Sequence, residues 1–128
     1  LGKTQLKKLP NIIAGRRKNA HYFKSLMCDH PKFRIQKEIG ESSWFGFSLI
    51  LKEEFCGQRT NILERLDALG FECRPIVGGN FLNNDVMKYL DYEVHGTLEN
   101  AEYLDKNGLF IGNHPYPIDK AIEVLTTI

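Results

Sequence analysis

Two short segments of the sequence bring together side chains that could bind a polar ligand. The first, residues 74–81, has the sequence R-P-I-V-G-G-N-F and contains a guanidinium (Arg74), a carboxamide (Asn80) and an aromatic ring (Phe81). Arginine suits phosphate or carboxylate groups, and the paired glycines let the backbone approach a ligand closely. The same residues also fit a simpler interpretation, in which a strand ends in a glycine turn and Arg74 forms a surface ion pair.

The second segment, residues 112–118, has the sequence G-N-H-P-Y-P-I. Its two prolines stiffen the chain, and we expect Asn113, His114 and Tyr116 to be presented together. Histidine titrates near neutral pH, which suits proton transfer or a hydrogen bond to a sugar hydroxyl. A single histidine is more often structural than catalytic, so a structural role for His114 stays open.

No self-contained catalytic motif accompanies these segments. The sequence lacks the G-x-S-x-G, P-loop, H-E-x-x-H and G-x-G-x-x-G patterns. Its three cysteines (Cys28, Cys56 and Cys73) are widely spaced, which argues against a disulfide framework or zinc knuckle and favours the cytoplasm. The four histidines form no metal-ligand pair. We therefore expect neither a catalytic residue nor a metal site in this chain.

The composition is that of a soluble globular domain. Of the 128 residues 42% are hydrophobic and 26% are charged, and the length fits one compact domain. The longest apolar run, residues 44–51, is too short to cross a bilayer, and no signal-peptide pattern is present. The chain begins with Leu1, and a helical pattern is under way by Gln5. We therefore expect a piece of a longer protein that has no membrane partner.

The net charge of +1 hides an asymmetric distribution. Residues 1–40 contain ten lysines and arginines against two acidic residues, whereas residues 41–128 contain seven against fourteen. A basic segment can bind nucleic acid, so a free-standing nucleic-acid-binding module is one hypothesis. However, these basic side chains share a predicted helix with a regular apolar stripe. That pattern favours a solvated helix face, or one that meets an acidic partner, over a nucleic-acid surface.

Hydrophobic spacing predicts the elements that position the two segments. Apolar side chains recur at three- and four-residue steps from Leu6 and Leu9 through Ile13 to Met27, as a helix with one buried face requires. Pro10 either restarts or kinks this helix. Further helices are predicted at residues 59–69, 85–90, 99–106 and from Pro117 onward, and strands at 35–39, 44–52, 71–77 and 109–111.

The predicted strand at residues 44–52 places Phe45, Phe47, Leu49 and Leu51 on one face, because side chains alternate along a strand. The order of helices and strands along the chain predicts an α+β fold. We expect a two-layer sandwich in which helices cover one face of a small, mainly antiparallel sheet.

Taken together, the segments resemble the DegT/DnrJ/EryC/StrS sugar aminotransferases. Residues 5–9 (Q-L-K-K-L) and 16–19 (R-R-K-N) are similar to the helix that joins the large and small domains of that family. Residues 74–81 and 112–118 resemble its keto-sugar 3-dehydratase branch. The resemblance implies that residues 1–30 are a linker helix to a large domain. Residues 31–128 would be the C-terminal small domain of a fold-type-I enzyme dependent on pyridoxal phosphate.

The resemblance further implies a 3-dehydratase that acts on a nucleotide-linked 4-keto-6-deoxy sugar. Its cofactor would be pyridoxamine 5'-phosphate or pyridoxal 5'-phosphate, and glutamate is a possible amino donor. The whole enzyme would be a homodimer. The residues that hold the cofactor are implied to lie outside this chain, which alone would be inactive.

The implied substrate-facing residues are Arg74, Asn80 and His114, with Phe81 and Tyr116 as walls. An aminotransferase of the same fold is the alternative, in which a lysine replaces the histidine at the cofactor. The aminotransferase branch usually has a histidine near residues 75–80, and this chain has none there.

Overall fold

A computed structural model describes residues 2–76 and 78–128. Every predicted helix and strand has a counterpart, although several ends shift by a few residues. The elements, in chain order, are α1 (Gly2–Met27), β1 (Phe33–Ile35), β2 (Gly46–Leu51), η1 (Glu53–Phe55), α2 (Arg59–Ala68), β3 (Cys73–Pro75), η2 (Phe81–Asn83), η3 (Asp85–Tyr89), α3 (Glu99–Asn107), β4 (Gly108–Gly112) and α4 (Asp119–Leu125), where η marks a short 3-10 helix. None of these described helices has both the length and the hydropathy needed to cross a membrane.

The four strands form one antiparallel sheet in the order β1-β2-β4-β3. In this register Leu49 lies opposite Ile35 and Leu109, while Ile111 lies opposite Phe47 and Cys73. Because side chains alternate between the two faces of a strand, these residues share one face of the sheet. That face forms the main part of the hydrophobic core.

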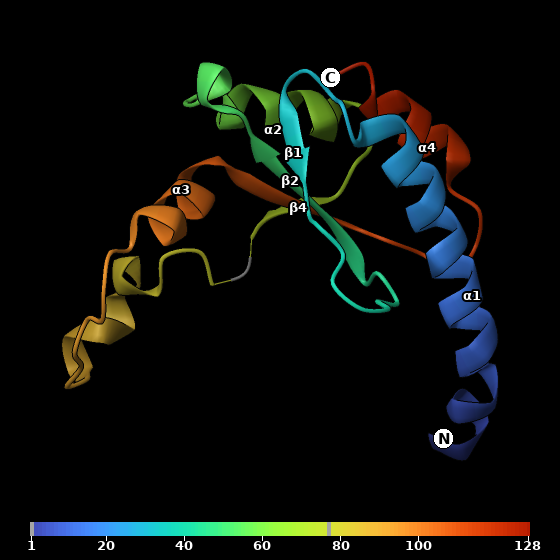
Figure 1. The fold of residues 1–128 in the computed structure, drawn as a ribbon, viewed down its shortest axis with the longest axis horizontal. Helices are drawn as coiled ribbons and strands as arrows, with labels where there is room; N and C mark the ends of the chain where they lie inside the picture. The colour runs from blue at the N-terminus through green and yellow to red at the C-terminus, as the bar shows by residue number, and fades with distance from the viewer. Residues whose placement is uncertain (1, 77) are drawn as a thin grey trace.

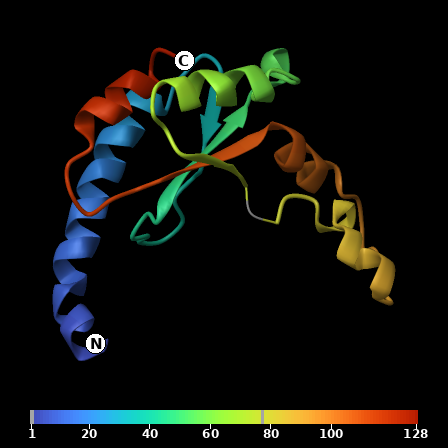
Figure 2. The same ribbon diagram turned by 180° about the vertical axis from the view of Figure 1, so that it is seen from behind.

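Helices α1, α2 and α4 cover this face. Phe23 of α1, Leu66 of α2 and Ile122 of α4 are each at most 1% exposed and belong to one cluster with the strand residues. Figures 1 and 2 show these three helices grouped around the sheet, with α3 and the segment before it extending to the other side. The predicted α+β two-layer sandwich is confirmed.

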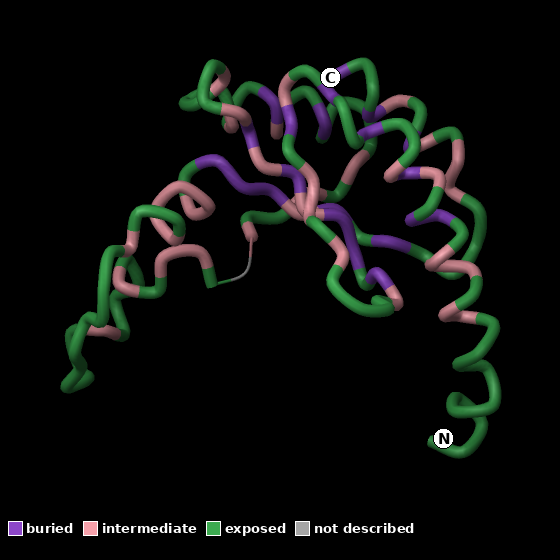
Figure 3. The backbone as a smooth tube through the Cα atoms, viewed as in Figure 1, coloured by how far each residue is buried: buried purple, intermediate pink, exposed green. Residues whose placement is uncertain are grey.

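Helix α1 is buried along its second half only. The helix runs through Pro10 without a break, and Asn19, Ala20, Phe23 and Met27 are its buried residues. The apolar stripe predicted for the first half of the helix is exposed, since Leu6 and Leu9 are 70% and 44% accessible. The physical reason is visible in Figures 1 and 3, where the first turns of α1 project beyond the sheet and no other described segment covers them.

Two strands are shorter than predicted. The strand expected at residues 35–39 is β1, which ends at Ile35 because the Gln36 side chain takes over the pairing: its Oε1 accepts from the amide of Ser48 at 2.8 Å. The strand expected at residues 71–77 contains only β3, which ends at Pro75. Proline has no N–H to donate to a sheet. Residue 77 lies outside the described residues.

The prediction that Phe45 shares one face with Phe47, Leu49 and Leu51, which are all buried, is wrong. Phe45 is 70% exposed, and the neighbouring Trp44 is 2% exposed and takes a place in the core. Trp44 has a φ of 51°, in the left-handed region that side-chain-bearing residues rarely adopt. This backbone conformation interrupts the alternation just before β2 begins, so the pattern of the strand does not extend to Phe45.

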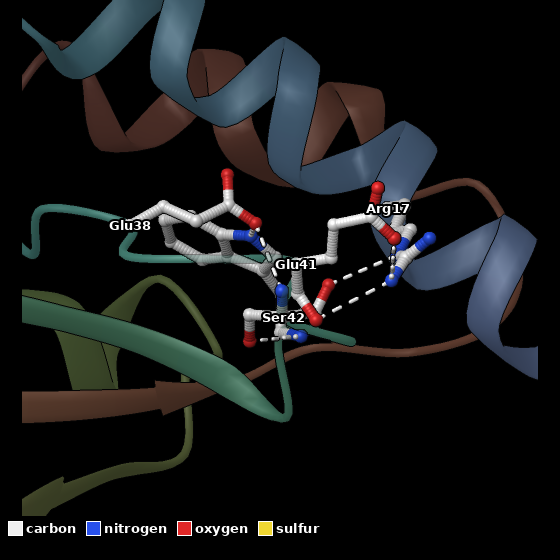
Figure 4. Close-up of polar contacts among 5 residues, drawn as sticks. Arg17, Glu38, Glu41 and Ser42 are labelled. Carbon is white, nitrogen blue, oxygen red and sulfur yellow. Dashed lines mark hydrogen bonds and ion pairs between the residues drawn. The ribbon is translucent and has the colours of Figure 1, made fainter.

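Polar contacts anchor the loop between β1 and β2 to α1 (Figure 4). The Glu38 carboxylate accepts from Lys24 Nζ at 2.8 Å, from Trp44 Nε1 at 2.9 Å and from the Ser42 amide at 3.1 Å. The hydrogen bonds from Lys24, then Trp44 and Ser42, lower the pKa of Glu38 to about 2. Arg17 Nε donates to the Ser42 carbonyl at 3.0 Å. The loop that ends at Phe45 is therefore held by contacts to α1 and by hydrogen bonds within the loop.

Candidate functional site

An open groove of about 740 Å³ lies between α4 and the side of the sheet formed by β3 and β4. Its apolar lining comes from the end of α2, the sheet and α4, and includes Phe47, Leu69, Phe71, Ile111, Ile118, Ile122 and Leu125. Its polar lining residues are Glu72, Arg74, His114, Tyr116 and Lys120. A concave, mostly apolar surface with a few polar groups is typical of a small-molecule site. Three of the five predicted substrate-facing residues thus meet in one groove.

Arg74 lies on the edge strand β3, where it pairs with Phe110 of β4. Its Nη2 donates to Glu72 Oε1 at 2.5 Å, which matches the surface ion pair considered as the simpler interpretation. The Arg74 guanidinium lowers the pKa of Glu72. Both side chains are largely exposed, and such pairs contribute little to stability. The guanidinium is therefore accessible to a phosphate or carboxylate.

His114 and Tyr116 lie in the loop between β4 and α4, and both are exposed. Their rings stack with centroids 4.7 Å apart and an interplanar angle of 16°. Asn113, which we expected beside them, is only 4% exposed. Its Nδ2 donates to the carbonyl oxygens of Arg16 at 3.0 Å and Trp44 at 2.9 Å. The Asn113 side chain therefore forms buried hydrogen bonds within the fold and is not presented to a ligand.

Asn80 and Phe81 do not line the groove. The Asn80 side chain caps η2, since Oδ1 accepts from the Leu82 amide at 3.2 Å and Nδ2 donates to Glu102 Oε2 at 2.8 Å. The pKa of Glu102 is lowered to about 2, first by Lys106 and then by the two asparagines at positions 80 and 83. Phe81 is 54% exposed beside this cap. The structure places these two residues near α3, and their predicted contact with substrate stays a prediction.

Sequence reasoning did not single out Phe45, Phe110 or Lys120, which also line the groove. Phe45 and Phe110 pack with ring centroids 6.1 Å apart, and the guanidinium of Arg16, which is not a lining residue, lies 5.4 Å from the Phe45 ring centroid. Lys120 of α4 adds a second cation to Arg74. The alternation of β4 offered a signal for Phe110, which lies between two core residues and so points to the opposite face. No comparable signal existed for Phe45.

The described residues contain no cluster of three or more histidine, cysteine, aspartate or glutamate side chains that could hold a metal ion. Burial raises the pKa of Cys73 to about 11, so its thiol stays protonated at neutral pH and is a poor nucleophile. Residues 2–76 and 78–128 include no buried lysine. The groove thus presents cationic, histidine and tyrosine side chains beside an apolar lining, an arrangement that can bind and orient a polar ligand.

Comparison with known proteins gives a consistent assignment. The sequence profile of the DegT/DnrJ/EryC1/StrS aminotransferase family matches residues 1–127. The GDP-4-keto-6-deoxy-D-mannose 3-dehydratase of Escherichia coli O55:H7 (strain CB9615 / EPEC) is 54% identical over 129 residues, which cover 100% of this chain and 33% of that protein.

Two solved structures are also similar. One is GDP-4-keto-6-deoxymannose-3-dehydratase with a trapped PLP-glutamate geminal diamine; it has a TM-score of 0.94 at 55% identity, over 98% of this chain and 33% of that chain. The other is a mutant of that dehydratase with bound GDP-perosamine, with a TM-score of 0.93 at 55% identity over the same shares. The chain therefore spans about a third of the length of the relatives it matches.

Proposed function

Because the chain belongs to the DegT/DnrJ/EryC1/StrS aminotransferase family, we propose that it is the small domain of a nucleotide-4-keto-6-deoxysugar 3-dehydratase. The groove is the observation that carries this proposal, because Arg74 of β3 lines it together with His114 and Tyr116 of the loop between β4 and α4. The 54% identity to a dehydratase that acts on GDP-4-keto-6-deoxy-D-mannose supports the same sugar nucleotide as substrate.

The groove residues have distinct roles in this proposal. Arg74 and Lys120 attract the negatively charged diphosphate of the substrate, since guanidinium and ammonium groups both bind phosphate. His114 and Tyr116 contact the sugar, the first by a hydrogen bond and the second as a wall. Phe81 and Asn80 complete the substrate site from the side of α3. The apolar lining of the groove excludes water from the bound sugar.

The reaction also requires a cofactor, pyridoxamine or pyridoxal 5'-phosphate, which supplies an electron sink when bound. The chain covers only 33% of the length of the dehydratase that it matches. We therefore place cofactor binding in a part of the protein outside this chain. Residues 1–30 form the helix that links residues 31–128 to that part.

Three further features belong to the same proposal. Glutamate serves as amino donor to the cofactor, which is supported by the PLP-glutamate adduct in a similar dehydratase. The whole enzyme is a homodimer that acts in the cytoplasm. The alternative is an aminotransferase of the same fold, supported by the description of the family. A nucleic-acid role for α1 has less support, since Arg17 and Lys24 contact the loop between β1 and β2.

The proposal is tested in the full-length protein with GDP-4-keto-6-deoxy-D-mannose as substrate. We expect Arg74→Ala and His114→Ala each to lower kcat/KM about 10- to 100-fold, the effect of losing one hydrogen bond to a charged or polar ligand group. The melting temperature should stay within about 2 °C of the wild-type value, because both side chains are exposed.

Arg34→Ala is the matched control. Arg34 is also an exposed arginine in an ion pair, with Glu53 at 2.7 Å, but it lies on β1 and does not line the groove. We expect its steady-state kinetics to match the wild type. Unchanged kcat/KM in both groove variants would contradict the proposed substrate site.

A further inference from the structure

The loop that carries His114 and Tyr116 crosses α1 at Gly15. A Cβ atom at Gly15 would lie 1.9 Å from the carbonyl oxygen of Pro115 and 2.8 Å from its carbonyl carbon. Both are backbone atoms, so any side chain at this position would push the loop away from the helix. Glycine in a helix interior is unfavourable relative to alanine, and the close approach of the loop gives a physical reason for it here.

Asn19, one turn further along α1, binds the same loop. It is 2% exposed, and its Nδ2 donates to the carbonyl oxygens of His114 at 2.9 Å and Tyr116 at 2.8 Å. It also donates to Asn113 Oδ1 at 3.2 Å. The two amide hydrogens of Asn19 therefore serve three acceptors, two of which flank Pro115.

Asn113 connects this contact to the rest of the groove. Its Nδ2 donates to the carbonyls of Arg16 and Trp44, and its backbone amide donates to the Phe45 carbonyl at 3.1 Å. Phe45 also lines the groove. One buried asparagine thus joins α1, the segment before β2 and the segment after β4. A buried polar network with its donors and acceptors satisfied makes the local structure rigid.

We propose that Gly15, Asn19 and Asn113 form a clasp of positioning residues that fixes the orientation of His114 and Tyr116 at the groove. In the described part of the chain, neither of these two side chains forms a hydrogen bond of its own, and their rings contact each other. Their orientation therefore depends on how the backbone on both sides of Pro115 is held. The substrate role of the clasp rests on the proposed function, whereas its geometric role does not.

The test compares two asparagine variants of the full-length protein. In Asn19→Asp an oxygen replaces the donating NH2 group and repels the three oxygen atoms that it bound. Asn107→Asp makes the same chemical change at a site that is equally buried, at 5% exposure, where Nδ2 donates to the Tyr103 carbonyl at 3.2 Å away from the groove. A general effect of burying a carboxylate should appear in both variants.

Two readouts separate the geometric role from the substrate role. The ring resonances of His114, observed with carbon-13-labelled histidine and assigned with His114→Gln, report its stacking on Tyr116 without any need for activity. We expect this ring-current shift to be lost in Asn19→Asp and retained in Asn107→Asp. We expect KM for GDP-4-keto-6-deoxy-D-mannose to rise about tenfold in Asn19→Asp with kcat within about twofold of wild type, because substrate binding loses about one hydrogen bond.

Each other outcome overturns part of the account. An unchanged His114 resonance in Asn19→Asp overturns the clasp, as do equal changes in the two variants. A lost ring-current shift with unchanged KM shows that the clasp holds the loop but contradicts the substrate role of His114 and Tyr116. If Asn19→Asp does not fold, Gly15→Ala serves instead, and Gly2→Ala is its control because a Cβ there meets nothing within 4 Å. The same two changes are expected in Gly15→Ala alone.

Discussion

At the scale of single residues, one carboxylate holds the loop that leads to the groove. Glu38 receives hydrogen bonds from Lys24, Trp44 and Ser42. Trp44 has a positive φ, a conformation that costs about 1–3 kcal/mol and persists only where its surroundings enforce it. The indole hydrogen bond to Glu38 and the burial of the ring supply that constraint, and so they determine where the neighbouring Phe45 lies.

The ionised Glu38 therefore stabilises the fold, and its contribution depends on pH. Its pKa of about 2 in the folded chain lies below the ordinary value of 4.5, so the contribution is complete above about pH 4.5 and is lost as the pH falls towards 2. We expect Glu38→Gln to unfold at a lower urea concentration than the wild-type chain at pH 7. The difference should shrink below pH 4.5 and vanish near pH 2; an equal difference at both pH values would rule out the ionic origin.

At the scale of elements, α1 combines two different environments in one helix. Phe23, in its second half, is fully buried and stacks on Phe47 of β2 with ring centroids 4.1 Å apart. Leu6, in its first half, is 70% exposed although it belongs to the same apolar stripe. The first half therefore contributes little to the stability of the 128-residue chain and is free to pack against another part of a longer protein.

Two substitutions in α1 measure this difference. Phe23→Ala should lower the free energy of unfolding of the 128-residue chain by about 3–5 kcal/mol, because it removes a buried aromatic ring and leaves a cavity. Leu6→Ala should change it by less than about 0.5 kcal/mol. Urea denaturation followed by circular dichroism gives both values. A loss for Leu6→Ala comparable to that for Phe23→Ala would mean that the first half is packed after all.

The strands show which features of the fold can be predicted from local sequence and which cannot. The alternation correctly predicted that Phe47, Leu49 and Leu51 share one face of β2, because strand periodicity is a local property. The ends of β1 and the direction of Phe45 could not be predicted. They depend on the Gln36 side chain pairing with a neighbouring strand and on a positive φ at Trp44, neither of which is encoded by periodicity.

For the candidate site, the residue types could be predicted from the sequence, but their proximity and their burial could not. The polar residue types in segments 74–81 and 112–118 indicated a binding surface, but their proximity depends on the pairing of β3 with β4, which sequence spacing does not reveal. Asn113 and His114 are adjacent and both polar, yet one is buried and the other is exposed. That difference arises from the contacts of α1 with a loop almost 100 residues later in the chain.

At the scale of the whole molecule, the groove lies where an edge of the sheet meets α4, and this chain spans about a third of the length of its relatives. In the proposed function, the chain contributes residues that bind and orient a sugar nucleotide, and the cofactor is bound elsewhere in the longer protein. On this account the activity belongs to the longer protein, and the small domain sets where the sugar lies. The central claim is that this protein removes a hydroxyl group and does not add an amine.

The mass of the sugar product tests that claim most directly. The full-length protein is incubated with pyridoxamine 5'-phosphate, glutamate and GDP-4-keto-6-deoxy-D-mannose, and the product is identified by mass spectrometry. The account predicts a sugar that has lost the C3 hydroxyl group and carries no nitrogen. An amino sugar that retains the C3 hydroxyl would contradict it and identify the protein as an aminotransferase.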